Sequence, residues 1–252
     1  MHSIKLITKK GEKVEPKIIS FGSGVNSVAM TIMLYKQNEI YPCVFADTLA
    51  EHPETYCYMD YFEKEFMSKY KQKILRLSPI NSKFHYPYAR RPLEEYLLEK
   101  KRVPATFGGY RACTTGWKRE PIQRFSKGKK QLIAFAFDEQ YRAKDLSHGY
   151  PLIDRKITRQ ECIRIIREAK LFIPSKSSCF FCSFQRIAQW EELYRKHPDL
   201  YARAVKLEEN ANRTIRPDGI SLQILKNRFD GKTGDLFPDC DFEELTPCLC
   251  TL

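Results

Sequence analysis

The sequence predicts an α/β fold with a doubly wound, mostly parallel sheet. β-prone segments alternate with segments of helical periodicity through the first half of the chain. Alternation at this spacing is typical of parallel strands joined by helices. The segment Gln131–Phe137 is apolar almost throughout, as expected of a strand that is buried on both faces. The second half is mostly helical and ends in a cluster of cysteines.

The expected elements follow in chain order. Strands are predicted at Lys17–Ser20, Pro42–Ala46, Ile74–Leu77 and Gln131–Phe137, and helices at Ser27–Gln37, Pro53–Tyr70, Thr158–Leu171, Phe184–Lys196 and Asp199–Arg213. Pro53 suits a first helical turn, where its missing N–H costs little. Thr158, with Glu161 in the third position after it, forms a capping signature. Pro198 interrupts the last helical stretch, and Asp199 is expected to cap the helix that follows.

Composition and charge restrict the class of protein and its partners. A hydrophobic content of 42% indicates a folded globular protein rather than a disordered one. The chain has 43 basic and 31 acidic residues, a net charge of +12, which favours anionic partners; a merely solvated basic surface is the alternative. No apolar run is long enough to span a bilayer, and residues 1–17 lack the apolar stretch of a signal peptide. We therefore expect a cytoplasmic protein with no membrane partner.

A loop of small residues follows the first strand and opens the first helix. It reads Ser20-Phe21-Gly22-Ser23-Gly24-Val25-Asn26-Ser27. Small residues let backbone N–H groups approach a phosphate, and a helix N-terminus adds partial positive charge. The hydroxyls of Ser23 and Ser27 are further donors. The spacing matches neither the lysine-containing phosphate loop nor the dinucleotide fingerprint. The loop predicts a phosphate site, with an ordinary strand-to-helix turn as the alternative.

Polar residues also follow the second and fourth strands. Ala46, Asp47 and Thr48 come at the end of the second strand, and Glu139 and Arg142 come shortly after the fourth. In open α/β sheets, ligands bind beyond the carboxyl ends of the strands. Asp47 is therefore expected to meet a ribose, a metal ion or a phosphate-linked water. Glu139 and Arg142 either contact the substrate or form a structural ion pair.

Nine cysteines are distributed unevenly along the chain. The cytosol keeps thiols reduced, and an odd count argues against complete pairing in disulfides. Cys43, Cys57 and Cys162 lie in apolar or helical stretches and are expected to be buried. Two residues separate Cys179 from Cys182, a spacing that lets both thiolates face one metal. A pair of buried thiols is the alternative.

The loop and the Asp47 segment resemble signatures of the PP-loop ATP pyrophosphatases, an adenine nucleotide α-hydrolase-like superfamily. The loop is similar to the pattern Ser-Gly-Gly-x-Asp-Ser, with Gly22 and Ser23 interchanged and Asn26 in place of the aspartate. The residues after the second strand resemble the Asp-Thr-Gly…Pro-Glu-Thr signature of the phosphoadenylyl-sulfate (PAPS) reductase branch, with Leu49 in place of the glycine. A later segment, from Arg111 to Pro121, resembles the family's Cys…Lys…Pro segment.

This resemblance covers nearly the whole chain and implies a Rossmann-like fold that binds ATP or a related adenine nucleotide. Mg²⁺ is a further candidate cofactor. The catalytic candidates are Lys118, Asp47 and Arg142, and Arg111 is a second candidate anion holder. The implied nucleotide-binding residues are Ser20, Phe21, Gly22, Ser23, Gly24, Asn26, Ser27, Ala46, Asp47, Thr48 and Glu139.

The resemblance also implies a metal centre held by cysteines. Related iron–sulfur reductases use a Cys-Cys pair and a later Cys-x-x-Cys, and here Thr114 takes the second place of that pair. A tail cysteine is the natural replacement, and Cys250 matches the last cysteine of short relatives better than Cys248 does. The expected ligands of a [4Fe–4S] cluster are Cys113, Cys179, Cys182 and Cys250 (or Cys248). Zinc is the rival, since four thiolates suit either metal. A nucleotide-binding α/β domain is expected over residues 1–172, and a helical region that completes the metal site over residues 173–252.

The implied activity is ATP-dependent sulfur transfer, in which a substrate is adenylated, pyrophosphate is released and the cluster carries sulfur. A sulfur donor such as a cysteine desulfurase is the expected protein partner. DNA and tRNA are candidate acceptors, because DNA phosphorothioation and tRNA thiolation systems contain such proteins. One alternative is a reductase of adenylyl sulfate or of PAPS; the lack of a Glu-Cys-Gly-x-His string near the C-terminus counts against it. The other is a non-catalytic nucleotide-binding subunit, which Asn26 leaves open.

Overall fold

The computed structural model describes residues 16–104 and 112–231, and the chain divides into two compact units. Unit 1 comprises Met1–Ala46, Pro53–Leu77 and Ile122–Ser177, whereas unit 2 comprises Asp47–His52, Ser78–Pro121 and Ser178–Leu252. Both units are therefore assembled from separate segments of the chain, while the sequence suggested one boundary after residue 172.

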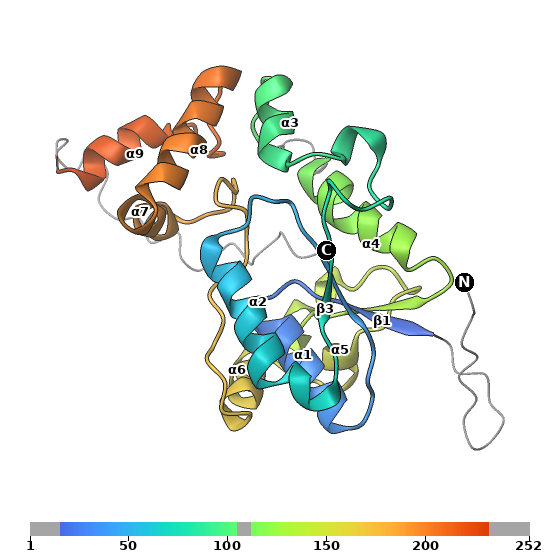
Figure 1. Cartoon of the computed structure of the whole chain (residues 1–252). Helices are drawn as coiled ribbons and strands as arrows, with labels where there is room; N and C mark the ends of the chain where they lie inside the picture. The colour runs from blue at the N-terminus through green and yellow to red at the C-terminus, as the bar shows by residue number, and fades with distance from the viewer. Residues whose placement is uncertain (1–15, 105–111, 232–252) are drawn as a thin grey trace. The chain divides into compact units, whose positions relative to one another are not determined.

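Unit 1 is built on a four-stranded parallel sheet (Figure 1). Its strands are β1 (Lys17–Ser20), β2 (Cys43–Ala46), β3 (Ile74–Leu77) and β4 (Lys130–Ile133), in the order β3-β2-β1-β4. The order reverses beside β1, so the region beyond the carboxyl ends of β1 and β4 is the switch point at which such sheets bind ligands. The predicted parallel α/β fold is confirmed, and β1 and β3 have the predicted bounds.

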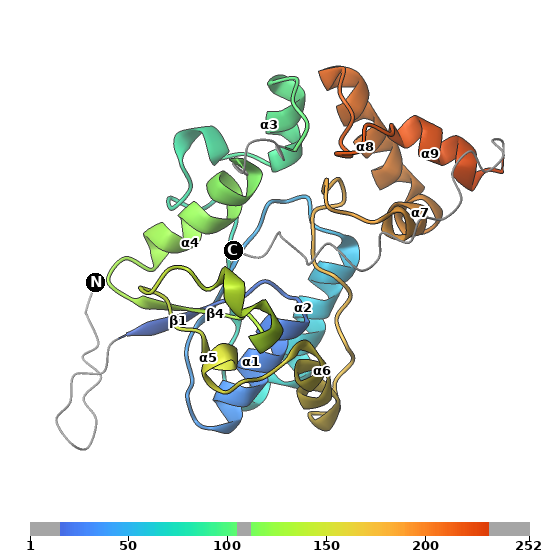
Figure 2. The ribbon, with the colours of Figure 1, turned by 180° about the vertical axis from the view of Figure 1, so that it is seen from behind.

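The helices of unit 1 pack around a central helix, α1. They are α1 (Val25–Lys36), α2 (Pro53–Glu65), α5 (Pro151–Asp154) and α6 (Arg159–Glu168), with the 3-10 turns η1 (Met67–Tyr70) and η5 (Phe137–Arg142). Every residue of α1 from Val25 to Tyr35 is buried, and most of them are apolar, as expected of a helix inside a core; Asn26, Ser27 and Thr31 are the polar exceptions. Phe21, Phe62 and Ile166 join α1 in one hydrophobic core. Figure 1 and Figure 2 show α6 beside α1 in two opposite views.

Besides shifts of one to three residues at the ends of other elements, three sequence expectations in unit 1 differ from the structure. The fourth strand was predicted to reach Phe137 but ends at Ile133, because the neighbouring strand β1 is itself short and its last residue, Ser20, pairs with Ile133. The helix predicted over Pro53–Tyr70 ends at Glu65 and is followed by η1. Cys43 and Cys162 are buried as predicted, but the prediction for Cys57 was wrong, because this residue lies on the exposed side of α2.

Unit 2 is helical. It contains η2 (Pro87–Ala89), α3 (Leu93–Glu99), the π-helix η4 (Thr114–Arg119), α7 (Ile187–Lys196), α8 (Pro198–Ala211) and α9 (Leu222–Phe229). The helix α4 (Glu120–Phe125) continues directly from η4 along the chain. Buried aromatic residues, including Trp117, Phe180, Trp190 and Tyr201, form the core of this unit. The short segment Asp47–His52 is tied into it by hydrogen bonds from Leu93 N to Thr48 O (3.1 Å) and from Phe180 N to Ala50 O (2.9 Å).

Two helices of unit 2 begin at residues other than those predicted. Asp199 was expected to cap α8, which is wrong: the helix already starts at Pro198, whose fixed φ suits the first helical position, and Asp199 lies within the first turn. α7 starts at Ile187 rather than Phe184, because residues 179–185 form turns, with Cys182 N donating to Cys179 O and Gln185 N donating to Cys182 O. In the described part of the chain, no helix combines the length and the apolar character that crossing a membrane requires.

The capping box predicted for α6 is present and gives the first testable prediction. Glu161 N donates to Thr158 Oγ1, and Thr158 N donates to the Glu161 carboxylate at 2.7 Å. We expect Thr158→Ala to lower the free energy of unfolding by about 1 kcal/mol, the usual cost of losing an N-cap side chain. Thr158→Ser keeps the hydroxyl and should stay close to the wild type in urea denaturation. Equal midpoints for both variants and the wild type would show that the box contributes nothing.

Candidate functional site

The N-terminus of α1 begins at a glycine. Gly24 is the N-cap residue, and no side chain among the described residues caps the helix. The first turn contains no acidic residue. The first amides of a helix have no partner within the helix and carry partial positive charge. This end of α1 is therefore suited to an anion.

Two buried hydroxyls in the same loop have no hydrogen-bond partner among the described residues. They belong to Ser20 and Ser23, whose side chains are 6% and 1% exposed. Ser23 has a φ of 57°, a left-handed conformation that is unfavourable for a residue with a Cβ. Strain and unsatisfied buried donors are both features of ligand sites rather than of ordinary turns. Ser27 differs from them, since its Oγ already donates to Gly24 O at 3.0 Å.

A chain of hydrogen bonds connects the loop with two segments that are far away in the sequence. Asn26 Nδ2 donates to Glu139 Oε2 (2.8 Å), and Arg142 Nη1 donates to Glu139 Oε1 (2.5 Å). On its other side, Asn26 Oδ1 accepts from Arg159 Nη1 (3.0 Å). Arg142 also stacks on the ring of Phe135, with its guanidinium carbon 4.3 Å from the ring centroid. The network fixes two arginines close to the start of α1.

The region around the predicted Asp47-Thr48 motif is divided between the units. Ala46 ends β2 in unit 1, whereas Asp47 and Thr48 belong to unit 2. Asp47 is buried, and its Oδ1 accepts from Leu49 N at 2.8 Å. Leu49 has a φ of 57°. The family pattern has glycine at this position, and glycine adopts positive φ without the cost that leucine incurs.

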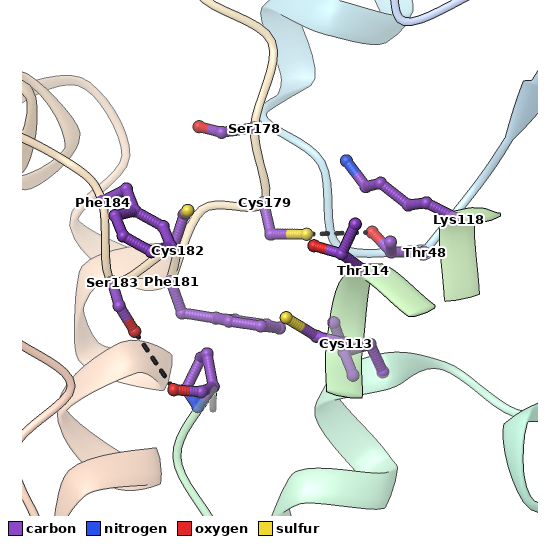
Figure 3. Close-up of a pocket in the computed structure, with 12 residues that line it drawn as sticks. Thr48, Cys113, Thr114, Lys118, Ser178, Cys179, Phe181, Cys182, Ser183 and Phe184 are labelled. Atoms are coloured by element: carbon purple, nitrogen blue, oxygen red, sulfur yellow. Dashed lines mark hydrogen bonds between the residues drawn. The ribbon is translucent and has the colours of Figure 1, made fainter. Parts of the chain in front are cut away.

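Unit 2 contains a pocket with three cysteines around it (Figure 3). It encloses about 480 Å³, part of which is open to solvent. Its lining residues are Thr48, Leu93, Pro104, Cys113, Thr114, Lys118, Ser178, Cys179, Phe181, Cys182, Ser183 and Phe184. Cys113 lies at the start of η4, and Lys118 lies within this helix. Trp117 holds the helix in place, because its side chain is buried and its Nε1–H donates to Arg91 O. Cys179 and Cys182 lie on one tight turn, so the fold brings together the three described cysteines that the sequence singled out.

A buried carboxylate contacts three of the residues that line this pocket. The side chain of Glu51 is fully buried, and its Oε1 lies 2.7 Å from Lys118 Nζ and accepts from Thr48 Oγ1 at 3.0 Å. Cys179 Sγ is 3.2 Å from Thr48 Oγ1 and 3.6 Å from Glu51 Oε1. A buried carboxylate requires such a cationic partner. Thr48, which the sequence assigned to the nucleotide, thus lines the cysteine pocket.

The environment of the pocket favours protonated thiols. Burial raises the pKa of Cys179 well above its ordinary value, and the Glu51 carboxylate adds to this effect while Lys118 opposes it. Burial also raises the pKa of Cys113, with a further contribution from Cys182. The raised pKa values favour the protonated form of both thiols over the thiolate.

A comparison with models of protein families identifies the family of this chain. The model of the phosphoadenosine phosphosulfate reductase domain matches residues 16–153, more than half of the chain. The chain belongs to this family. The predicted resemblance to a PP-loop, PAPS reductase-like family is therefore confirmed, and membership supports a nucleotide-dependent enzyme of sulfur chemistry. A search of curated proteins returned no match.

The match to the reductase domain includes the small-residue loop before α1, Cys113 and Lys118, but it ends before Cys179 and Cys182. Among residues 16–104 and 112–231, no group of three or more His, Cys, Asp and Glu side chains is arranged to hold a metal ion. The two tail candidates for the fourth ligand, Cys250 and Cys248, lie outside the described residues, as does Arg111. Every cysteine in the described segments is a free thiol.

The sequence did not mark several residues of these sites as functional, among them Glu51, Thr114, Arg159 and Ser178. Ser178 lines the cysteine pocket with a buried hydroxyl that has no partner among the described residues. Glu51 and Arg159 each acquire their role from a partner that is distant in the sequence, Lys118 and Asn26 respectively.

The unsatisfied hydroxyl of Ser20 gives a prediction that separates binding from folding. Ser20→Ala should leave the melting temperature unchanged or slightly higher, because it removes a buried hydroxyl without a partner among the described residues. The same variant should bind ATP about tenfold more weakly, since a hydrogen bond to a charged group contributes about 1.5–3 kcal/mol.

Ser126→Ala is the matched control. Its buried hydroxyl donates to Gln123 O and accepts from Gln131 Nε2. This variant should lose about 1 kcal/mol of stability and keep its affinity for ATP. The interpretation of Ser20 as a ligand donor is refuted if Ser20→Ala is destabilised like the control and binds ATP normally in isothermal titration calorimetry.

Proposed function

We propose that this protein is an ATP-dependent enzyme that adenylates its substrate, releases pyrophosphate and transfers sulfur. The observation that carries the proposal is the start of α1, where an uncapped helix end, two unsatisfied buried hydroxyls and two nearby arginines occur together in the described part of the chain. Phosphate groups satisfy each of these features at once. Attack on the α-phosphorus is the reaction that PP-loop enzymes as a class carry out, and family membership supports it here.

The residues of unit 1 have separate roles in this proposal. The amides that follow Gly24 and the hydroxyls of Ser20 and Ser23 bind the phosphates, together with Phe21 and Gly22 as part of the loop. Arg142 offsets the negative charge that develops on the phosphates in the transition state, as fixed cations do in phosphoryl chemistry. Ala46 is proposed to contact the nucleotide or its Mg²⁺ ion from the end of β2. The nucleotide or metal contact expected of Asp47, a residue of unit 2, stays a prediction from the sequence.

The cysteine pocket supports the sulfur-transfer part of the proposal. Thiolates of Cys113, Cys179 and Cys182, with Cys250 (or Cys248) as the fourth ligand, are proposed to hold a [4Fe–4S] cluster. Lys118 lines the same pocket and offsets part of the negative charge of such a set. When bound, the cluster would supply redox chemistry for the transfer, and it could carry sulfur on iron only where the fourth iron is left without a cysteine ligand. Zinc is the rival occupant of the same thiolates.

The acceptor is proposed to be a nucleic acid, DNA or tRNA. The net charge of +12 favours a polyanion over a small neutral substrate. A sulfur donor such as a cysteine desulfurase would be the protein partner. Two other functions have support of their own: a reductase of PAPS or adenylyl sulfate, which the name of the matched family suggests, and a non-catalytic nucleotide-binding subunit.

Pyrophosphate release tests the proposed chemistry. The wild type should release pyrophosphate from ATP, faster when tRNA or duplex DNA is added at low salt, where counterion release favours binding. Gly24→Val should abolish release, because its side chain obstructs the approach of phosphate to the loop. The fold should tolerate the change: Gly24 has an ordinary φ of −92°, and an added Cβ meets only Ser177 Oγ, at 3.4 Å, among the described residues.

Sulfite released from PAPS by a thiol reductant, with no pyrophosphate from ATP, would instead identify a reductase. Nucleotide binding without either product would identify a binding subunit.

Anaerobic purification tests the metal centre. We expect a brown protein with iron and acid-labile sulfide, both lost in Cys113→Ser, Cys179→Ser and Cys182→Ser. Cys57→Ser is the control, because Cys57 is exposed on α2 and lines no part of the pocket. Stoichiometric zinc without sulfide, in protein from iron-replete cells, would contradict the cluster and favour the rival metal.

A further inference from the structure

The position at which this chain departs from the family loop is also the centre of its hydrogen-bond network. Asn26, which stands where the PP-loop pattern has aspartate, is 8% exposed. Its side-chain nitrogen faces a carboxylate, Glu139, and its side-chain oxygen faces a guanidinium, Arg159. A carboxylate only accepts hydrogen bonds and a guanidinium only donates them. An amide is therefore the side chain that satisfies both neighbours in this geometry.

An aspartate at position 26 would not fit this arrangement. It could accept from Arg159, but its second oxygen would lie about 3 Å from the Glu139 carboxylate, and two carboxylates in contact do not both ionise readily. Glu139 would have to take up a proton or turn away. Because Arg142 is held by the other oxygen of Glu139, either response would disturb Arg142 as well.

The charges of the network lead to the same conclusion. Arg142, Glu139 and Arg159 together carry one net positive charge, and Asn26 adds none. With aspartate at position 26 the sum would be zero, beside a helix terminus that is suited to an anion. The amide therefore keeps the entrance to the loop positive.

We propose that Asn26 is a positioning residue that holds Glu139 and Arg159, and through Glu139 also Arg142, for the phosphates of the nucleotide; in this pair the amide is at position 26 and the carboxylate is at position 139. The inference rests on the proposed nucleotide site in unit 1. It has the consequence that restoring the family aspartate alone harms this enzyme, whereas exchanging the two side chains restores it.

The test is a cycle of three variants: Asn26→Asp, Glu139→Gln, and both changes together. In the double variant the new carboxylate at position 26 accepts from Arg159 and from the new amide at position 139. The oxygen of that amide still accepts from Arg142, so every donor has an acceptor and the net charge returns to one. We expect Asn26→Asp to weaken ATP binding by about tenfold or more, because of the carboxylate contact. The double variant should recover to within about threefold of the wild type, since neighbouring residues in one network are not additive.

Gln160→Glu is the control for charge alone. It adds one negative charge at the exposed residue next to Arg159, without touching the pair, and should change ATP affinity by less than about twofold, as exposed charges do. Affinity is measured by calorimetry well below the melting temperature of each variant, and kcat and KM for pyrophosphate release are measured in parallel.

The outcomes distinguish this inference from the function it rests on. Wild-type protein that binds no adenine nucleotide overturns both. If the wild type binds ATP and Asn26→Asp binds it equally well, the inference fails while the proposed function stands. A double variant as weak as the two single variants combined also overturns it. A further outcome is that Asn26→Asp lowers the melting temperature and the double variant restores it, while ATP affinity shows no such loss and recovery. The pair is then only structural, and the positioning role is refuted.

Discussion

Unit 1 depends on how the chain enters α1. This helix is buried from Val25 to Tyr35, and it starts beyond the inner strand β1 without a capping side chain from the described residues. A buried helix end of this kind leaves amides without partners, which is costly unless something else satisfies them. The described part of the protein adds to that cost with two unpartnered hydroxyls and a serine at positive φ. The proposed phosphate site therefore coincides with features that lower the stability of the fold. Such local strain is typical of functional sites.

Long-range contacts hold this strained loop in place. Asn26 connects α1 with the segment after β4 through Glu139 and with the N-terminus of α6 through Arg159. α6 in turn begins with a complete capping box, so the backbone that carries Arg159 is well defined. In unit 2, Glu51 has a corresponding role, because its buried carboxylate joins Thr48, Lys118 and Cys179 behind the cysteine pocket. In both units one buried polar side chain joins segments that are distant in the sequence.

The sequence predicted features whose causes are local. The bounds of β1 and β3, the small-residue loop and the capping box of α6 depend on short stretches of residues, and all are present. Features that depend on a partner were missed or misplaced. The end of β4 is set by the length of β1, and the exposure of Cys57 by which side of α2 faces the core. No local pattern could indicate that Glu51 would meet Lys118, that Arg159 would meet Asn26, or that residues 47–52 and 78–121 would pack with the last part of the chain.

The most direct test of the central claim is to follow the backbone amides of the loop while nucleotide is added. Two-dimensional NMR of nitrogen-15-labelled protein, titrated with a non-hydrolysable ATP analogue, reports on each N–H separately. The account predicts large shifts and slowed hydrogen exchange at Ser23, Gly24 and the first turn of α1, because these amides would donate to phosphate oxygens. Shifts of comparable size elsewhere, with the amides of residues 23–27 unchanged, would contradict it.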